Sequence, residues 1–237
     1  MSTAEKISYQ LQLKNSQENK EIVQRFFKTG IGEYAQDDIF LGVKVPEIRK
    51  IAKENYDITI EETLKLLTSK IHEERLIALY FLINKYKNAN EQVKQNIFNL
   101  YLSNTQHINN WDLVDTSCEH IVGEFLKDKP KNHLFALAKS SNLWERRIAV
   151  VSTFFFIKQK DHKVALEIVN TLLSDKHDLI NKACGWMLRE VGKRCSEKIL
   201  TDYLEINSSK MSRTTLRYAI EKFDKNKREY FLKKDKQ

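Results

Sequence analysis

Helical segments recur along this chain at a nearly constant spacing, and this repeat is what most limits its fold. Four segments can be aligned: 73–82, 145–154, 180–189 and 215–224. Each carries a basic residue shortly before a small one, and a fifth small residue falls in the gap after the first segment. The small residues are Ala78, Ser117, Ala149, Ala183 and Ala219, and they are spaced 39, 32, 34 and 36 residues apart. Helical units of this period predict a solenoid of HEAT-like helix pairs.

Apolar residues recur at helical spacing almost throughout, and strand-like alternation is scarce. The clearest predicted helices cover 61–69, 74–86 and 178–193. Thr59 and Glu62 form a predicted capping box before the first, and Pro46 and Pro130 stand where helices could begin. We expect about a dozen helices and no sheet. They would form one all-α domain over 1–237, a curved solenoid of antiparallel helix pairs with a concave basic face. The alternative is a generic helical bundle in which small residues allow close packing.

The composition is typical of a soluble globular protein with a polyanionic partner. Lys and Arg number 40 against 32 Asp and Glu, which gives a net charge of +8 and favours nucleic acid over membrane. Cys118, Cys184 and Cys195 form no C-x-x-C pair, so a reducing compartment fits best. The sequence has no signal core and no run of 18 apolar residues. We therefore expect a cytoplasmic protein, associated with the nucleoid when it acts on DNA.

Motifs for metal, nucleotide or serine-hydrolase chemistry are missing. The six histidines have no metal-ligand spacing, and the segment TGIGEY lacks the Lys and the length of a phosphate-binding loop. No serine stands in a G-x-S-x-G context. We therefore expect neither a metal nor a cofactor.

Each of the three tryptophans lies close in sequence to a charged residue. The pairs are Trp111 with Asp115, Trp144 with Arg147, and Trp186 with Arg189. In a solenoid, residues at equivalent positions of successive repeats line one surface, so the three pairs would meet there. Arg146 and Lys182 add positive charge to the same repeats. Such a groove could bind phosphates, attract a cation to the indoles and stabilise positive charge beside the carboxylate. The alternative is that the indoles belong to the core.

Five separated motifs carry a family resemblance. They are FLGVKVPEIRK (40–50), WDLVD (111–115), NLWERRIA (142–149), KACGWMLREVGKR (182–194) and SRTTLRYAIEKF (212–223). Together, and in this order, they resemble the AlkD-type DNA alkylation repair glycosylases, which are built from HEAT-like repeats. The match runs from about residue 17 to about residue 225.

The resemblance implies roles for particular residues. Asp115 matches the catalytic carboxylate, and Trp111 and Trp186 match the aromatic pair that cradles the lesion nucleotide. The implied DNA contacts are Arg147 and Arg189 to phosphates, and Lys44 and Arg49 to the opposite strand. The chain departs from the pattern at Phe26, where some members have Tyr, and at Lys44 and Val45, where some have polar groove contacts.

The implied activity is excision of cationic N3- and N7-alkylated purines from duplex DNA, by hydrolysis of the N-glycosidic bond in base excision repair. The family leaves the lesion stacked instead of flipping it, and we expect a monomer to suffice. Two alternatives remain: a non-catalytic HEAT-repeat module that binds damaged or branched DNA, and a scaffold for protein interactions. The basic tail over 225–237 is expected to be a frayed end, and the alternative is an extra DNA contact.

Overall fold

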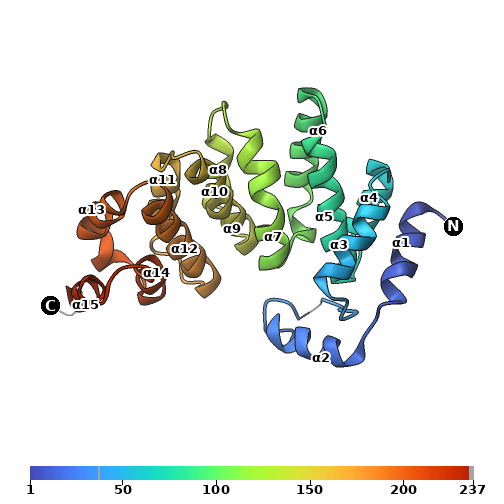
Figure 1. The fold of residues 1–237 in the computed structure, drawn as a ribbon, viewed down its shortest axis with the longest axis horizontal. Helices are drawn as coiled ribbons and strands as arrows, with labels where there is room; N and C mark the ends of the chain where they lie inside the picture. The colour runs from blue at the N-terminus through green and yellow to red at the C-terminus, as the bar shows by residue number, and fades with distance from the viewer. Residues whose placement is uncertain (37, 235–237) are drawn as a thin grey trace. The chain divides into compact units, whose positions relative to one another are not determined.

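The computed structural model describes residues 1–36 and 38–234, and their regular structure is helical (Figure 1). Within these residues the only extended pairing is an isolated parallel bridge between Ile39 and Ile71. The prediction of an all-α fold is therefore confirmed. The chain forms two compact units, Met1–Ser117 and Cys118–Gln237. No helix in the described part has the length and apolarity that crossing a bilayer requires.

The elements of the first unit are α1 (Thr3–Gln12), α2 (Gln17–Phe26), α3 (Val45–Glu54), α4 (Ile60–Leu67), α5 (His72–Lys87), α6 (Glu91–Ser103), a 3-10 turn (Thr105–His107) and α7 (Trp111–Cys118), which ends at the boundary. Two of the three helices predicted most clearly, those over 61–69 and 74–86, lie in the first unit as α4 and α5. Pro46 lies in the first turn of α3, as predicted. The predicted capping box is only half formed. The Thr59 hydroxyl accepts the Glu62 N–H at 3.2 Å, but the Glu62 carboxylate instead accepts the N–H of Ala4.

The second unit consists of a succession of helix pairs. Its elements are a π-helical turn (Glu119–Gly123), α8 (Asn132–Ala138), α9 (Leu143–Ser152), α10 (Phe154–Lys158), α11 (Lys163–Leu172), α12 (Asp178–Arg194), α13 (Glu197–Asn207), a 3-10 turn (Ser208–Lys210), α14 (Arg213–Ala219) and α15 (Lys225–Lys234). Helices α9, α12 and α14 contact one another in that order, and α8 and α11 pack beside α9 and α12 (Figure 1). This stacking of successive pairs is the packing of a solenoid.

The repeated small residues are buried, which explains why the repeat is visible in the sequence. All five are at most 1% exposed: Ala78, Ser117, Ala149, Ala183 and Ala219. A larger side chain at these positions would push adjacent helices apart. The one polar member, Ser117, has its hydroxyl bonded to Leu113 O at 2.6 Å and Tyr101 Oη at 2.8 Å. The repeated position is therefore a packing position.

The basic residue three positions before the small one has a structural role in two repeats. Arg75 pairs with Asp38 at 2.5 Å, and Arg146 pairs with Asp175 at 2.6 Å. In each case the Nη1 atom also donates to the carbonyl of a serine six residues earlier, at 2.9 Å from Arg75 and 3.0 Å from Arg146. These arginines hold the start of a helix to the loop before it.

The motif at 40–50 begins with a loop that is fixed by a buried carboxylate. Glu73 accepts the N–H groups of Leu41, Gly42 and Val43, with the shortest distance, 2.8 Å, to Gly42. Gly42 has φ +78°, and a Cβ atom there would lie 2.5 Å from both Lys20 N and Ser16 O. The glycine therefore lets the N-terminus of α2 dock closely on this loop.

The C-terminal segment is ordered where the sequence predicted fraying. Residues 225–234 form α15, and Phe231 is fully buried against Phe223, with 6.0 Å between the ring centroids. Lys227 pairs with Glu197 on α13 at 2.6 Å. The buried phenylalanine holds this end, although most of the helix surface is charged. Residues 235–237 lie outside the described part.

We expect Gly42→Ala to lower the free energy of unfolding by more than about 2 kcal/mol, because the new Cβ meets the backbone of α2. Gly32 is the matched control: it has φ +79°, but none of the described atoms lies within 4 Å of the place its Cβ would take. Gly32→Ala should lower the free energy of unfolding only by the cost of a side chain at positive φ, about 1 kcal/mol. Urea unfolding of both variants measures the difference, and equal losses would contradict the close approach.

Candidate functional site

Helix α7 carries two of the predicted site residues. Trp111 is its first residue, and Asp115 follows one turn later, so the two side chains lie on neighbouring parts of one helix face. Both are partly exposed. The buried side chain of Asn110 accepts the Trp111 N–H at 2.8 Å and so caps the helix. The carboxylate and the indole that the sequence predicts to act together are therefore adjacent.

Aromatic rings surround the Trp111 indole on the side of α2. Phe27 stacks on it with 5.3 Å between centroids and an interplanar angle of 28°, and Phe26 meets it edge-on at 5.5 Å. Phe27 in turn stacks on Phe40 at 5.1 Å. Phe27 and Phe40 are buried, whereas Phe26 is 63% exposed. Phe26 therefore extends the indole surface into solvent as an apolar ring without a hydroxyl group.

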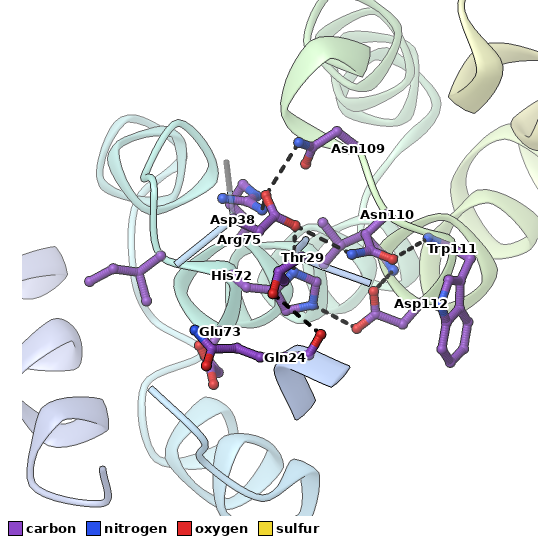
Figure 2. A network of polar contacts seen from close by, with 12 residues as sticks. Gln24, Thr29, Asp38, His72, Glu73, Arg75, Asn109, Asn110, Trp111 and Asp112 are labelled. Atoms are coloured by element: carbon purple, nitrogen blue, oxygen red, sulfur yellow. Dashed lines mark hydrogen bonds and ion pairs between the residues drawn. The ribbon is translucent and has the colours of Figure 1, made fainter. Parts of the chain in front are cut away.

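A buried histidine connects α5 to the first turn of α7 (Figure 2). His72 Nε2 lies 2.7 Å from Asp112 Oδ2, and Nδ1 lies 3.4 Å from Asp38 Oδ2. The ring stacks on Phe40 at 4.5 Å and lies 5.2 Å from Phe27. The network thus combines two carboxylates and one imidazole, and the rings of Phe27 and Phe40 pack against the imidazole.

Amide and guanidinium groups complete the network around Asp38 (Figure 2). Arg75 donates to Asp38 Oδ1 at 2.5 Å, and the side-chain amides of Asn109 and Asn110 donate at 3.4 and 3.3 Å. Because Asn110 also caps α7, the Asp38 carboxylate is linked to the start of α7 through Asn110 as well as through His72 and Asp112.

The charges in this network shift the pKa values of its members in opposite directions. Burial by itself lowers the pKa of His72, but the Asp112 and Asp38 carboxylates outweigh it and raise that pKa to about 9. Burial by itself raises the pKa of Asp38, yet the hydrogen bond from His72 and the charge of Arg75 lower it overall. At neutral pH the site therefore holds an imidazolium between two carboxylates.

The second unit carries the other predicted site residues. Trp186, on α12, is partly buried and lies against Phe154 at 5.8 Å with an interplanar angle of 45°. One turn further along α12, Arg189 pairs with Glu221, and its side chain is 20% exposed. Lys182 pairs with Asp178 at 2.7 Å and is 41% exposed. Trp186 belongs to the second unit and Asp115 to the first, so their meeting at one site stays a prediction.

The paired arginines of α9 are mostly engaged within the protein. Arg147 is 5% exposed, and its Nη1 donates to Leu179 O at 2.6 Å. Arg146 has the ion pair and carbonyl contacts described above, including Ser141 O at 2.9 Å. Their predicted roles in DNA binding stay predictions, and the visible role of both is to hold loops to helices.

The two basic residues predicted to reach the opposite strand are exposed. Lys44 is the residue before α3, and its side chain makes no capping bond. Arg49 donates from Nε to Tyr80 Oη at 3.2 Å and lies 5.7 Å from the Tyr80 ring centroid. Both are on the first unit, beside the loop that Glu73 fixes.

The three tryptophans are predicted to occupy equivalent positions in their repeats, and this prediction is wrong. Counted from the repeated small residue of its own repeat, Trp111 comes six positions before, Trp144 five before and Trp186 three after. Trp144 is only 7% exposed and belongs to the core. The three tryptophans share a charged neighbour in sequence but differ in their phase on the helix.

Positive charge is unevenly divided between the units. Residues 118–237 hold 25 of the 40 Lys and Arg but 16 of the 32 Asp and Glu, a net charge of +9. Residues 1–117 hold the remaining 15 and 16, a net charge of −1. The positive charge that favours a polyanionic partner is therefore carried mainly by the unit that contains Trp186.

Sequence reasoning missed the network around His72. Asp38 and Asp112 are 34 and 40 residues from His72, and no local motif connects the three. Only the packing of α7 against α5 and the segment before the loop at 40–43 brings them together.

Comparisons with known proteins agree with the family resemblance. A family model described as "DNA alkylation repair enzyme" matches residues 7–223. A structure described as a predicted DNA alkylation repair enzyme from Enterococcus faecalis has 15% identity and a TM-score of 0.67, covering 90% of this chain and 98% of that one. The smu.31 protein from Streptococcus mutans has 18% identity and a TM-score of 0.55, covering 87% and 100%. No curated protein matches. At these identities the two structures show a shared fold.

We expect the free energy of unfolding to fall as pH rises from 6.5 to 9. The pKa of His72 is about 9 in the folded protein and near 6.5 in an unfolded chain, so the folded state holds the proton more tightly. This stabilisation is complete below pH 6.5 and is lost as pH passes through 9; its size is on the order of 3 kcal/mol. Urea unfolding across this range measures it.

The controls for this pH dependence replace single histidines. His72→Gln should abolish the decrease, whereas His133→Gln, at an exposed position, should retain it. A wild-type stability that stays flat between pH 6.5 and 9 would contradict an imidazolium at this position.

Proposed function

Because the chain belongs to the DNA alkylation repair enzyme family, we propose that it is a DNA glycosylase that releases cationic N3- and N7-alkylated purines from duplex DNA. The observation that carries the proposal is that Asp115, a partly exposed residue, lies one helical turn from Trp111. The family membership supports alkylated DNA as the substrate class, and we assign the chemistry to the carboxylate.

Alkylation at N3 or N7 gives the purine a positive charge and makes it a good leaving group. As the glycosidic bond breaks, positive charge moves to the deoxyribose, and a nearby carboxylate attracts the sugar more strongly than before. This interaction grows toward the transition state, so it lowers the barrier and does not merely tighten binding. We assign this role to Asp115, which would also orient the attacking water. No metal or cofactor is needed, because the lesion's own charge activates the base.

The indoles of Trp111 and Trp186 are proposed to contact the sugar and backbone of the lesion nucleotide. An aromatic face attracts a cation by about 0.5–2 kcal/mol, depending on how dry the contact is. Trp111 is suited to this role because Phe27 supports one side of its ring. We propose that the base stays stacked in the duplex, so bulky adducts can be tolerated.

Phosphate binding is assigned first to cations that are exposed or partly exposed. Lys44 and Arg49 would contact one strand, and Lys182 and Arg189 the other, after Arg189 exchanges Glu221 for a phosphate. The excess positive charge of residues 118–237 supports this assignment. Arg146 and Arg147 would contribute mainly by holding their loops, since their guanidinium groups already bond to the protein. A monomer has all of these groups.

We expect Asp115→Asn to reduce the rate of 7-methylguanine release from methylated duplex DNA by about a hundredfold to a thousandfold. The substitution removes the charge and keeps the size of the side chain. Release is measured by chromatography of the free base under single-turnover conditions. Asp202→Asn is the matched control, because Asp202 is an exposed aspartate on α13 that pairs with Lys198. Unchanged release by Asp115→Asn would refute the catalytic role, and tight binding without release by wild type would favour a binding module.

We expect uracil to be released at less than about a hundredth of the rate for 7-methylguanine. Uracil is a neutral and poor leaving group, and the proposed site holds no acid assigned to protonate it. The measurement uses matched duplexes that differ only in the lesion. Efficient uracil excision would show that the enzyme activates the leaving group by a means absent from this mechanism.

A further inference from the structure

The first turn of α7 is held by three separate contacts from elsewhere in the first unit. His72 on α5 binds the Asp112 carboxylate, Asp38 binds the Asn110 amide, and Phe27 stacks on the Trp111 ring. The cluster in Figure 2 therefore acts on the residues directly before and inside the turn that carries Trp111. None of these contacts is required by the proposed chemistry itself.

The position of Asp115 depends on this turn. Asp115 follows Asp112 by three residues in one continuous helix, so a rotation or shift of the first turn moves its carboxylate as well. Charge stabilisation at a sugar carbon is sensitive to such movement, and a misplacement of about 1 Å can cost about a hundredfold in rate. Whatever fixes Asp112 therefore also fixes Asp115.

We propose that His72 is a positioning residue for the site: its imidazolium, bonded to Asp38 and Asp112 at once, sets the orientation in which α7 presents Trp111 and Asp115. This inference rests on the proposed function for its catalytic consequence. The structural link between His72 and α7 does not depend on that function.

The double contact requires the charged form of the ring. A neutral imidazole has one N–H donor, and its other nitrogen is an acceptor that would face a carboxylate. Only the imidazolium donates from both nitrogens, so loss of the proton breaks the contact with Asp38 or with Asp112. The charged groups that face the ring are these two carboxylates and Arg75, whose positive charge is bound to Asp38.

The first experiment uses 5-fluorotryptophan-labelled full-length protein and 19F NMR. The three tryptophans give three resonances, and Trp111→Phe identifies the one from α7. We expect the Trp111 resonance to shift as pH rises through about 9, while those of Trp144 and Trp186 stay constant. In Asp112→Asn, which keeps an oxygen acceptor but loses the charge, the midpoint should move toward neutral pH because His72 holds its proton less tightly.

The second experiment measures single-turnover release of 7-methylguanine between pH 6 and 9.5. At pH 7, His72→Gln and Asp112→Asn should each lower the rate of the chemical step by about tenfold to a hundredfold, with less than about a twofold change in duplex affinity. The difference from wild type should shrink as pH approaches 9.5, since the wild-type clamp is then also lost. If His72 and Asp112 had only a structural role, the variants would be less stable, but their difference in rate from wild type would not shrink as pH rises.

Asp178→Asn is the matched control. Asp178 lies five residues before Ala183, as Asp112 lies five before Ser117, but its side chain is 57% exposed and pairs with Lys182. It should leave the Trp111 titration and the shape of the rate–pH profile unchanged. A Trp111 resonance that does not titrate, or that titrates identically in Asp112→Asn, overturns the clamp even if excision is normal. A normal Trp111 titration in a protein that excises nothing overturns the proposed function and leaves the link to α7 standing.

Discussion

A protonated imidazole held between two carboxylates joins three parts of the first unit that are far apart in sequence. His72 on α5, Asp38 before the loop at 40–43 and Asp112 on α7 all meet there. The rings of Phe27 and Phe40 exclude water from one side of the contact, which strengthens the attraction and makes an unpaired charge there costly. The direction of α7 follows from satisfying these groups together.

The loop at 40–43 is also fixed by a buried side chain, to which its backbone N–H groups donate hydrogen bonds. Glu73 neighbours His72 in sequence, yet its carboxylate bonds to three successive backbone N–H groups instead of a cation. Adjacent residues of α5 thus hold two different neighbours: His72 holds α7, and Glu73 holds the loop on which α2 docks. Because α2 brings Phe26 and Phe27 to Trp111, both residues contribute to the aromatic surroundings of the indole.

The fold was largely predictable, because its signal is periodic. Buried small residues recur at each repeat, and the long apolar stripes of α5 and α12 match their observed bounds closely. The four-residue spacing of Trp111 and Asp115 also suits one face of a single helix, and both lie on α7. Three matters were beyond such reasoning. The burial of Trp144 depended on which face of α9 packs inward, and the order of α15 depended on the single burial of Phe231. The third, the network around His72, consists of contacts between segments with no shared motif.

The contrast between buried and exposed charges has a consequence for how ionic strength should act on this protein. Phosphate contacts of exposed lysines and arginines weaken as salt is added, because counterions compete for the same sites. The His72 cluster is almost closed to solvent, with Asp38 and His72 side chains each 3% exposed, so mobile ions screen it little. Under the proposed function, salt that weakens DNA binding would therefore leave the helix bearing Asp115 in place. Each new encounter with a duplex would begin from an already aligned carboxylate.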